Sequence, residues 1–147
     1  MFGNVVDGVM LLNDAGKIIA DEWIKSSEIR REIDLDEWVV MPNHFHGIIV
    51  ITGDSVRAHG RAPLQKPQGV SDRELYRTPK SIGAMIAGFK SASTKRINQL
   101  RQTPGAKLWL RNYWEHVIRN EHDLSKIREY ICNNPIKWEY DRLYIPM

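Results

Sequence analysis

Hydrophobic residues recur along this chain with two different periods. Apolar positions at helical spacing predict helices over roughly residues 8–26 and 81–102. A third helical pattern begins near Asn120 or Asp123 and stops at Pro135. Each of these segments has one apolar stripe, so we expect three amphipathic helices that bury one face against the rest of the domain.

The segment between the first two helices has the alternation typical of strands. Residues 33–39 alternate between apolar and polar side chains, and the dipeptide Pro42-Asn43 marks a turn. The run HFHGIIVIT at 44–52 is apolar beyond its histidines, as expected of a strand covered on both faces. The two strands would form a hairpin, and residues 108–120 are predicted to be a further strand.

The resulting order is helix, strand, strand, helix, strand, helix. This order predicts an α+β protein with a ferredoxin-like sheet, helices on one face, the first strand of the βαββαβ layout missing, and an extra C-terminal helix. The length of 147 residues suits one domain spanning 1–147, and the Gly-, Pro- and charge-rich residues at about 53–80 predict a basic flexible loop.

Composition narrows the class of protein. The single cysteine excludes an internal disulfide, and no apolar stretch approaches the length of a membrane span. The N-terminus also lacks a basic region followed by a hydrophobic run. We therefore expect a cytoplasmic protein that does not bind membranes.

The net charge of +3 conceals an uneven distribution. Residues 1–54 carry a balance of −6, residues 55–111 carry +10, and residues 112–147 carry −1. So basic a middle third is typical of a protein that binds a polyanion, and nucleic acid is the favoured partner. The alternative is a solvated segment that is basic only for solubility. The candidate DNA-binding side chains on the helix over 81–102 are Lys90, Lys95, Arg96 and Arg101.

Two histidines stand at the start of the second strand. Residues i and i+2 of a strand project from the same face, so His44 and His46 would lie side by side with Phe45 turned away. This geometry suits a shared metal ion or a phosphate, although by itself it specifies neither.

Tyr130 and Asn134 form an i, i+4 pair beside the buried stripe of the last helix. Each has an ordinary structural interpretation. A tyrosine at the edge of a buried stripe is usually a packing residue, and an asparagine at the end of a helix, just before a proline, is usually a C-cap. Combined with the histidine pair they form a coherent chemical set. A cation held by two neutral imidazoles can polarise a phosphodiester, which then accepts the tyrosine oxygen, and Asn134 could supply a third ligand.

These residues resemble a known family. MPNHFHGIIVI resembles the HUH motif (His, bulky hydrophobe, His) of the single-tyrosine transposases, and the run from WLRNYWEHVIRN to CNNPIKWEYD resembles the C-terminal signature of their REP-associated branch. The resemblance implies that His44 and His46 bind a divalent metal, Mg²⁺ or Mn²⁺, that Tyr130 is the nucleophile, and that Asn134 completes the metal site.

The same resemblance implies a function. Such enzymes cleave and rejoin single-stranded DNA, often hairpins at palindromic repeats, and leave the 5′ phosphate on tyrosine. The resemblance therefore also implies a bacterial protein that is associated with the nucleoid. Because histidines are unusual ligands for Mg²⁺, we expect Mn²⁺ to serve at least as well.

Two alternatives remain open. The chain could be a non-catalytic DNA-binding remnant, or a phosphodiesterase that uses water; the second is disfavoured because no carboxylate accompanies the histidines at ligand spacing. Family members also begin with a strand that MFGNVVDG does not supply. We therefore expect low stability and weak activity, or strand exchange between two copies that makes a homodimer.

Overall fold

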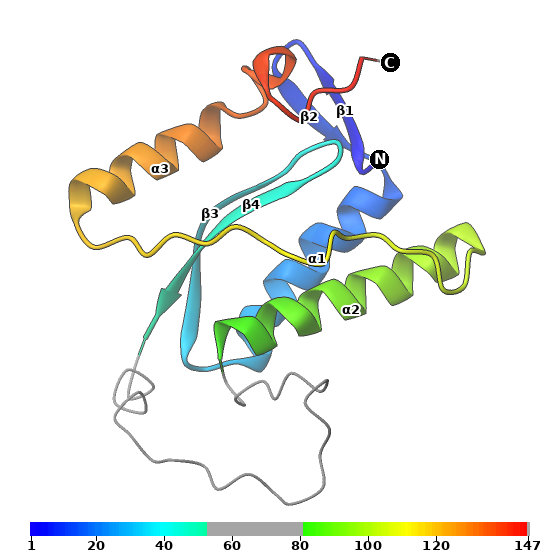
Figure 1. Cartoon of the computed structure of the whole chain (residues 1–147), viewed down its shortest axis with the longest axis horizontal. Coiled ribbons are helices and arrows are strands. Elements are labelled where there is room, and N and C mark those ends of the chain that lie inside the picture. The colour runs from blue at the N-terminus through cyan, green and yellow to red at the C-terminus, as the bar shows by residue number, and fades with distance from the viewer. Residues whose placement is uncertain (53–80, 147) are drawn as a thin grey trace, which may run out of the picture.

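The structure is a computed structural model that describes residues 1–52 and 81–146. The predicted basic loop at about 53–80 lies outside the described residues. The described part contains two antiparallel hairpins and three α-helices (Figure 1). Their bounds are β1 (Gly3–Val6), β2 (Val9–Leu12), α1 (Asp14–Ile29), β3 (Ile33–Val40), β4 (Phe45–Ile51), α2 (Ile82–Arg101), α3 (Glu121–Asn133) and the short 3-10 helix η2 (Trp138–Tyr140).

The first helix begins later than the sequence predicts. Residues 9–12 form β2 and pair with β1, and α1 starts only after Asn13, whose side-chain oxygen accepts a hydrogen bond from Gly16 N at 3.0 Å. The two-residue turn before β2 needs left-handed backbone, which Asp7 (φ 50°) and Gly8 (φ 73°) adopt. The apolar run VMLL fits either period, and the cap at Asn13 decides the boundary.

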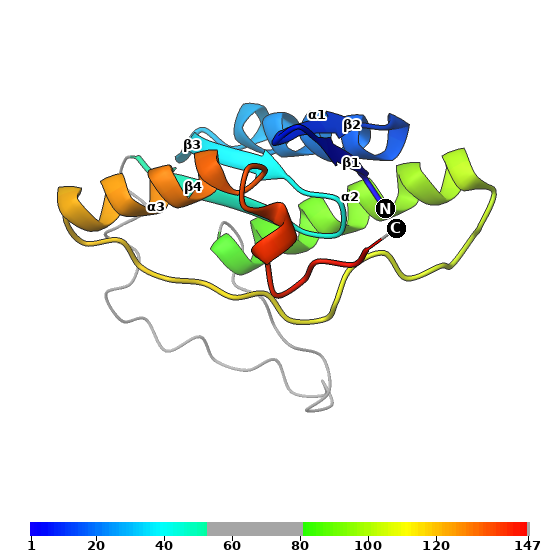
Figure 2. The same cartoon turned by 90° about the horizontal axis from the view of Figure 1, so that it is seen from above.

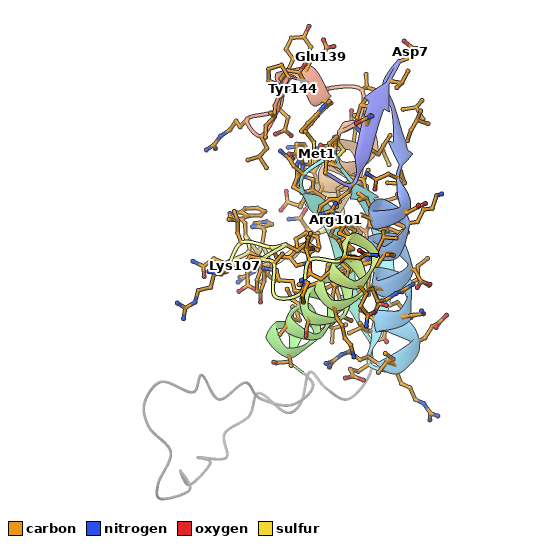
Figure 3. All side chains as sticks on the ribbon, turned by 90° about the vertical axis from the view of Figure 1, so that its right-hand side faces the viewer. Met1, Asp7, Arg101, Lys107, Glu139 and Tyr144 are labelled. Atoms are coloured by element: carbon orange, nitrogen blue, oxygen red, sulfur yellow. The ribbon has the colours of Figure 1, made fainter. Side chains whose placement is uncertain are left out.

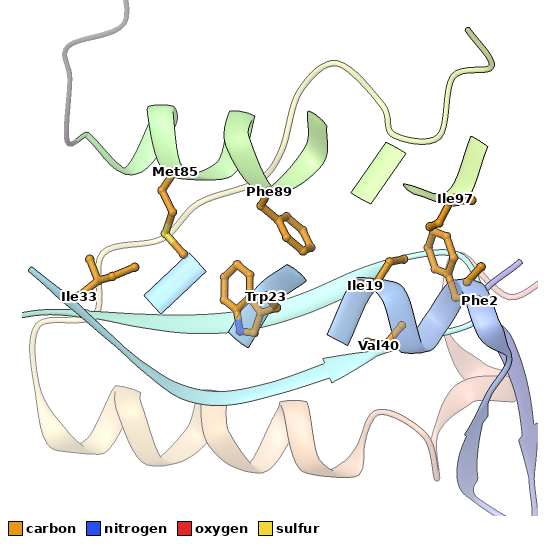
Figure 4. Packing of buried hydrophobic residues seen from close by; sticks show 9 residues of the cluster. Phe2, Ile19, Trp23, Ile33, Val40, Met85, Phe89 and Ile97 are labelled. Carbon is orange, nitrogen blue, oxygen red and sulfur yellow. The ribbon is translucent and has the colours of Figure 1, made fainter. Parts of the chain in front are cut away.

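The β3–β4 hairpin is confirmed and forms the centre of the molecule. Helices α1 and α2 pack on one face of it, where Trp23 and Phe89 lie close together (Figure 4). The ring centroid of Trp23 is 5.2 Å from that of Phe89 and 4.6 Å from that of Phe45. Ile19 and Ile97 are fully buried in the same layer. Helix α3 lies against the opposite face of the hairpin (Figures 2 and 4).

The predicted strand at 108–120 is wrong. These residues run in an extended but irregular path with no strand pairing. Trp109 anchors the segment, because its indole N–H donates to Ser93 Oγ at 3.0 Å, but Leu110, Trp114 and Val117 are exposed. The alternation in this segment therefore buries no face. Alternation specifies a strand only where one of the two faces is buried.

The start of the chain is fixed to the body of the domain. Phe2 is buried and its backbone N–H donates to Pro42 O at 2.7 Å, at the turn between β3 and β4. The Met1 carbonyl accepts from Arg101 Nη2 at 3.1 Å, and Figure 3 shows these two residues close together. The β1–β2 hairpin is thereby held beside the β3–β4 turn.

The architecture agrees with the expected fold class. It is an α+β fold consistent with a ferredoxin-like arrangement, with α1 and α2 on one face of the central hairpin and the additional C-terminal helix α3 on the other. No helix in the described part of the chain has both the length and the apolar character needed to span a bilayer.

Candidate metal and tyrosine site

His46 of strand β4 points toward α3 because the next residue, Gly47, must face α1. A Cβ added to Gly47 would come within 2.7 Å of the Trp23 ring, so α1 approaches β4 more closely than a side chain would allow. Successive strand residues point to opposite faces, which turns His46 to the α3 side. His44 lies in the preceding turn, and the two imidazole centroids are 4.8 Å apart, so the predicted pair is brought together.

Helix α3 is fastened to β3 by a two-point ion pair. Arg128 donates from Nε to Asp36 Oδ1 at 2.8 Å and from Nη2 to Oδ2 at 2.5 Å. The register of β3 is irregular between Leu35 and Trp38, and this bulge lies where Asp36 meets α3. The bidentate geometry fixes both the position and the rotation of α3.

That rotation brings the helix residues to the histidines. The Tyr130 ring stands edge-on to His46, with centroids 5.4 Å apart, and its side chain remains about half exposed (51%). Asn134, one turn further on, is buried with 4% exposure. The structure thus assembles His44, His46, Tyr130 and Asn134 from two distant parts of the chain.

Three atoms of this group have an unusual property. Among the described residues, four buried side-chain polar atoms have no hydrogen-bond partner, and three of them are His44 Nε2, His46 Nε2 and Asn134 Oδ1. An orphaned buried polar group costs about 1–3 kcal/mol, so three in one place require an explanation. Each of the three atoms can present a lone pair, and a shared divalent cation would then satisfy them together. The donor set therefore fits a metal ion.

The tautomer of His44 supports this interpretation. Its Nδ1 lies 2.8 Å from Asn43 Oδ1, and with the amide oxygen as acceptor the proton is on Nδ1. Nε2 then carries only its lone pair. A hydrogen bond at one ring nitrogen that frees the other for coordination is the usual arrangement of metal-bound histidine.

Both imidazoles are held neutral. Burial, together with the neighbouring His44, lowers the pKa of His46 to about 4. Burial likewise lowers the pKa of His44, while the charge of Asp141 and the Asn134 side chain oppose the fall. The neutral form is the one that can ligate a metal, so the pair is ready to do so at neutral pH.

The structure also adds a carboxylate that sequence spacing missed. Asp141 follows η2, and its Oδ2 lies 3.9 Å from His44 Nε2 with the side chain 14% exposed. No carboxylate is expected at ligand spacing from the histidines along the chain, and Asp141 approaches His44 only in space. The only sequence signal for Asp141 is its place at the end of the run WEYD, which carries part of the family resemblance.

In the described residues, no group of three or more His, Cys, Asp or Glu is arranged to hold a metal ion by itself. The amide oxygen of Asn134 is not among these residue types. A metal site here consequently depends on Asn134 as well as on the histidines.

The four predicted DNA-binding side chains have different surroundings. Arg96 pairs with Asp21 and, at 2.5 Å, with Glu22, and so connects α2 to α1. Lys90 Nζ donates to the Leu110 carbonyl at 2.9 Å. Arg101 binds the Met1 carbonyl. Lys95 is exposed and borders an open groove between α2 and residues 105–111, which is also lined by Lys90, Lys107 and Arg111.

Two known bacterial proteins are similar to this chain. The chain is 36% identical over 145 residues to an uncharacterized protein of Haemophilus influenzae, covering 99% of this chain and 78% of that one, so the two belong to one family. It is 27% identical over 108 residues to the REP-associated tyrosine transposase of Escherichia coli, covering 73% of this chain.

The second similarity is weaker and partial, because the matched region spans 47% of the E. coli protein's length. No family model matches the sequence, and no solved structure matches significantly. The similarity supports a relationship to the REP-associated tyrosine transposases, which is the family that the sequence motifs resemble.

Proposed function

We propose that the protein is a metal-dependent single-tyrosine transposase that cleaves and rejoins single-stranded DNA through a 5′-phosphotyrosine intermediate. The observation that carries this proposal is the cluster of three unpartnered buried atoms, on His44, His46 and Asn134, beside the half-exposed ring of Tyr130. The partial similarity to the E. coli transposase supports the same conclusion.

In this proposal each side chain has a definite role. His44, His46 and Asn134 hold Mg²⁺ or Mn²⁺, and the ion, when bound, supplies the Lewis acid that polarises the phosphodiester. The Tyr130 oxygen attacks phosphorus and loses its proton to solvent. The bond from phosphorus to the 3′ oxygen breaks, and that oxygen takes up a proton and leaves as a 3′ hydroxyl.

The covalent intermediate preserves the energy of the cleaved linkage. A 3′ hydroxyl of another strand can therefore attack the phosphotyrosine and rejoin DNA without ATP. The exposure of Tyr130 supports this role, because a strand must reach the phenol directly. We infer that the substrate is single-stranded DNA, with hairpins at palindromic repeats as the first class to test.

The decisive experiment detects the covalent adduct. The protein is incubated with labelled single-stranded hairpins and Mn²⁺, and the products are separated on a denaturing gel. We expect an adduct that Tyr130→Phe abolishes, whereas Tyr140→Phe, which changes a fully exposed tyrosine (89%), should retain it. An adduct that persists in Tyr130→Phe would move the nucleophile elsewhere, with Tyr113 the next candidate. Binding of the hairpins without any adduct would identify a non-catalytic remnant.

A further inference from the structure

We propose that the Asp141 carboxylate is an additional ligand of the metal held by His44, His46 and Asn134. This inference rests on the proposed function, because it concerns the same metal site. It adds a charged oxygen ligand, supplied by the segment after α3, that the histidine–tyrosine motif does not contain.

The first argument is the distance between two facing lone pairs. Asp141 Oδ2 and His44 Nε2 are 3.9 Å apart, which is too long for a hydrogen bond. Nε2 carries no proton when Nδ1 donates to Asn43 Oδ1. The separation is shorter than two metal–ligand bonds of about 2.1 Å placed end to end, so one ion can contact both atoms. Among the described residues, His44, His46 and Asp141 do not by themselves form a metal-binding group, so Asp141 joins the site as a fourth ligand beside Asn134.

The second argument is that the carboxylate is held in place by its other oxygen. Asp141 Oδ1 accepts from Leu143 N at 2.7 Å, which leaves Oδ2 to face His44. The Leu143 carbonyl in turn accepts from Asn43 Nδ2 at 2.7 Å. Asn43 therefore positions both the imidazole and the segment that carries the carboxylate.

Aromatic packing supports the same arrangement. Trp138 is buried, and its ring lies 5.8 Å from the His44 ring and 5.4 Å from Tyr144 between centroids. Asp141 caps the C-terminal end of the 3-10 helix η2, and its N–H donates to the Trp138 carbonyl at 3.0 Å. The carboxylate is thus presented by a packed segment. Within residues 1–52 and 81–146, Asp141 has no salt bridge with a lysine or arginine side chain, and its Oδ2 faces His44.

The third argument concerns charge and ligand type. Two neutral imidazoles and an amide give a site with no charge, which is a poor match to a hard divalent cation. Adding Asp141 gives two nitrogen and two oxygen ligands with one negative charge. Such a set favours Mn²⁺ or Mg²⁺ more than a pair of histidines alone would.

The test is direct measurement of metal binding without DNA. Calorimetric titration with Mn²⁺ and with Zn²⁺ is carried out on the wild type, Asp141→Asn, Asp141→Glu and Glu139→Gln. Asp141→Asn retains the acceptor for Leu143 N and removes only the charge. The matched control, Glu139→Gln, neutralises an exposed carboxylate two residues away. The melting temperature of each metal-free protein reports whether folding is preserved.

We expect Asp141→Asn to weaken Mn²⁺ binding at least tenfold and Zn²⁺ binding less, with Glu139→Gln like the wild type and Asp141→Glu weakened less than Asp141→Asn. Equal Mn²⁺ affinity in the wild type and Asp141→Asn, or equal affinity in Asp141→Glu and Asp141→Asn, would overturn the role of Asp141. If the wild type bound no Mn²⁺, or if His46→Ala bound it unchanged, the metal site itself would fail instead.

Discussion

His46 is a residue at which folding and chemistry have opposite requirements. Its imidazole is buried beside another imidazole and Tyr130, and its Nε2 has no partner. A buried neutral histidine is readily available to a metal but costs stability in the metal-free protein.

This cost predicts how stability depends on pH. The pKa of His46 is about 4 in the folded protein, below its ordinary value of 6.5, and the pKa of His44 is also lowered. Between these values the unfolded chain binds more protons than the folded one, so stability falls as the pH falls from about 6.5 to 4. His46 alone accounts for a loss of about 3 kcal/mol by pH 4.

Urea unfolding of the metal-free protein at pH 7, 6, 5 and 4 measures this loss. In His46→Phe, which removes the titrating group, the decline should be markedly shallower. Identical pH profiles for the two proteins would show that His46 is not held neutral by the fold.

The histidines should separate catalysis from DNA binding. His44→Ala and His46→Ala remove the proposed metal ligands but no positive charge, because both imidazoles are neutral at pH 7. We expect metal-dependent cleavage to disappear, while the dissociation constant for single-stranded DNA changes by less than about threefold, a difference below 1 kcal/mol. Gel-shift titration and the adduct assay measure the two properties. An equal loss of both would indicate that the histidines are a structural pair.

At the scale of elements, the position of α3 decides whether Tyr130 meets the histidines. Arg128→Ala removes both hydrogen bonds to Asp36, so α3 should become more mobile relative to β3. We expect faster hydrogen exchange of α3 amides and a lower rate of adduct formation at saturating DNA. Lys126→Ala, an exposed position on the same helix, is the control. Wild-type adduct rates in Arg128→Ala would show that the ion pair does not position the nucleophile.

The sequence predicts some elements well for identifiable reasons. The β3–β4 hairpin, α2 and α3 combine a clear period with a turn or cap, such as Ser81 and Asn120, whose side chains accept from the first helical turns. Residues 9–12 fit helix and strand equally, and the pairing with β1 together with the helix cap at Asn13 decides between them. Residues 108–120 alternate without burying a face, so their pattern predicts a strand that the structure does not contain.

The candidate site shows the same limit. His44 and His46 are predicted from local spacing, and Tyr130 and Asn134 from helical spacing. The approach of Asp141 to His44 depends on how the chain turns back after α3, through contacts of Trp138 and Asn43 that no local pattern encodes.

At the scale of the whole molecule, the basic middle of the chain serves more than one purpose. Arg96 joins α2 to α1 through Asp21 and Glu22, whereas Lys95 is exposed beside an open groove. Charge reversal at these neighbouring positions should therefore have different results. Arg96→Glu should lower the melting temperature because it places a third acidic side chain against two others. Lys95→Glu should leave the melting temperature unchanged and weaken DNA binding.

Salt titration separates the two effects. A phosphate contact contributes a slope of about 0.7 in the logarithm of affinity against the logarithm of salt for single strands, so the deficit of Lys95→Glu should shrink as salt rises. Thermal melts and fluorescence anisotropy at several salt concentrations provide the measurements. A salt-independent deficit would mean that Lys95 does not face the DNA backbone.

The assembly of the candidate site from both halves of the chain has a consequence for protein synthesis. The histidines leave the ribosome well before Tyr130, Asn134 and Asp141. Under the proposed function, a nascent chain therefore presents its metal-binding histidines before it possesses its nucleophile. A translation product interrupted between these segments would then lack the group that attacks DNA.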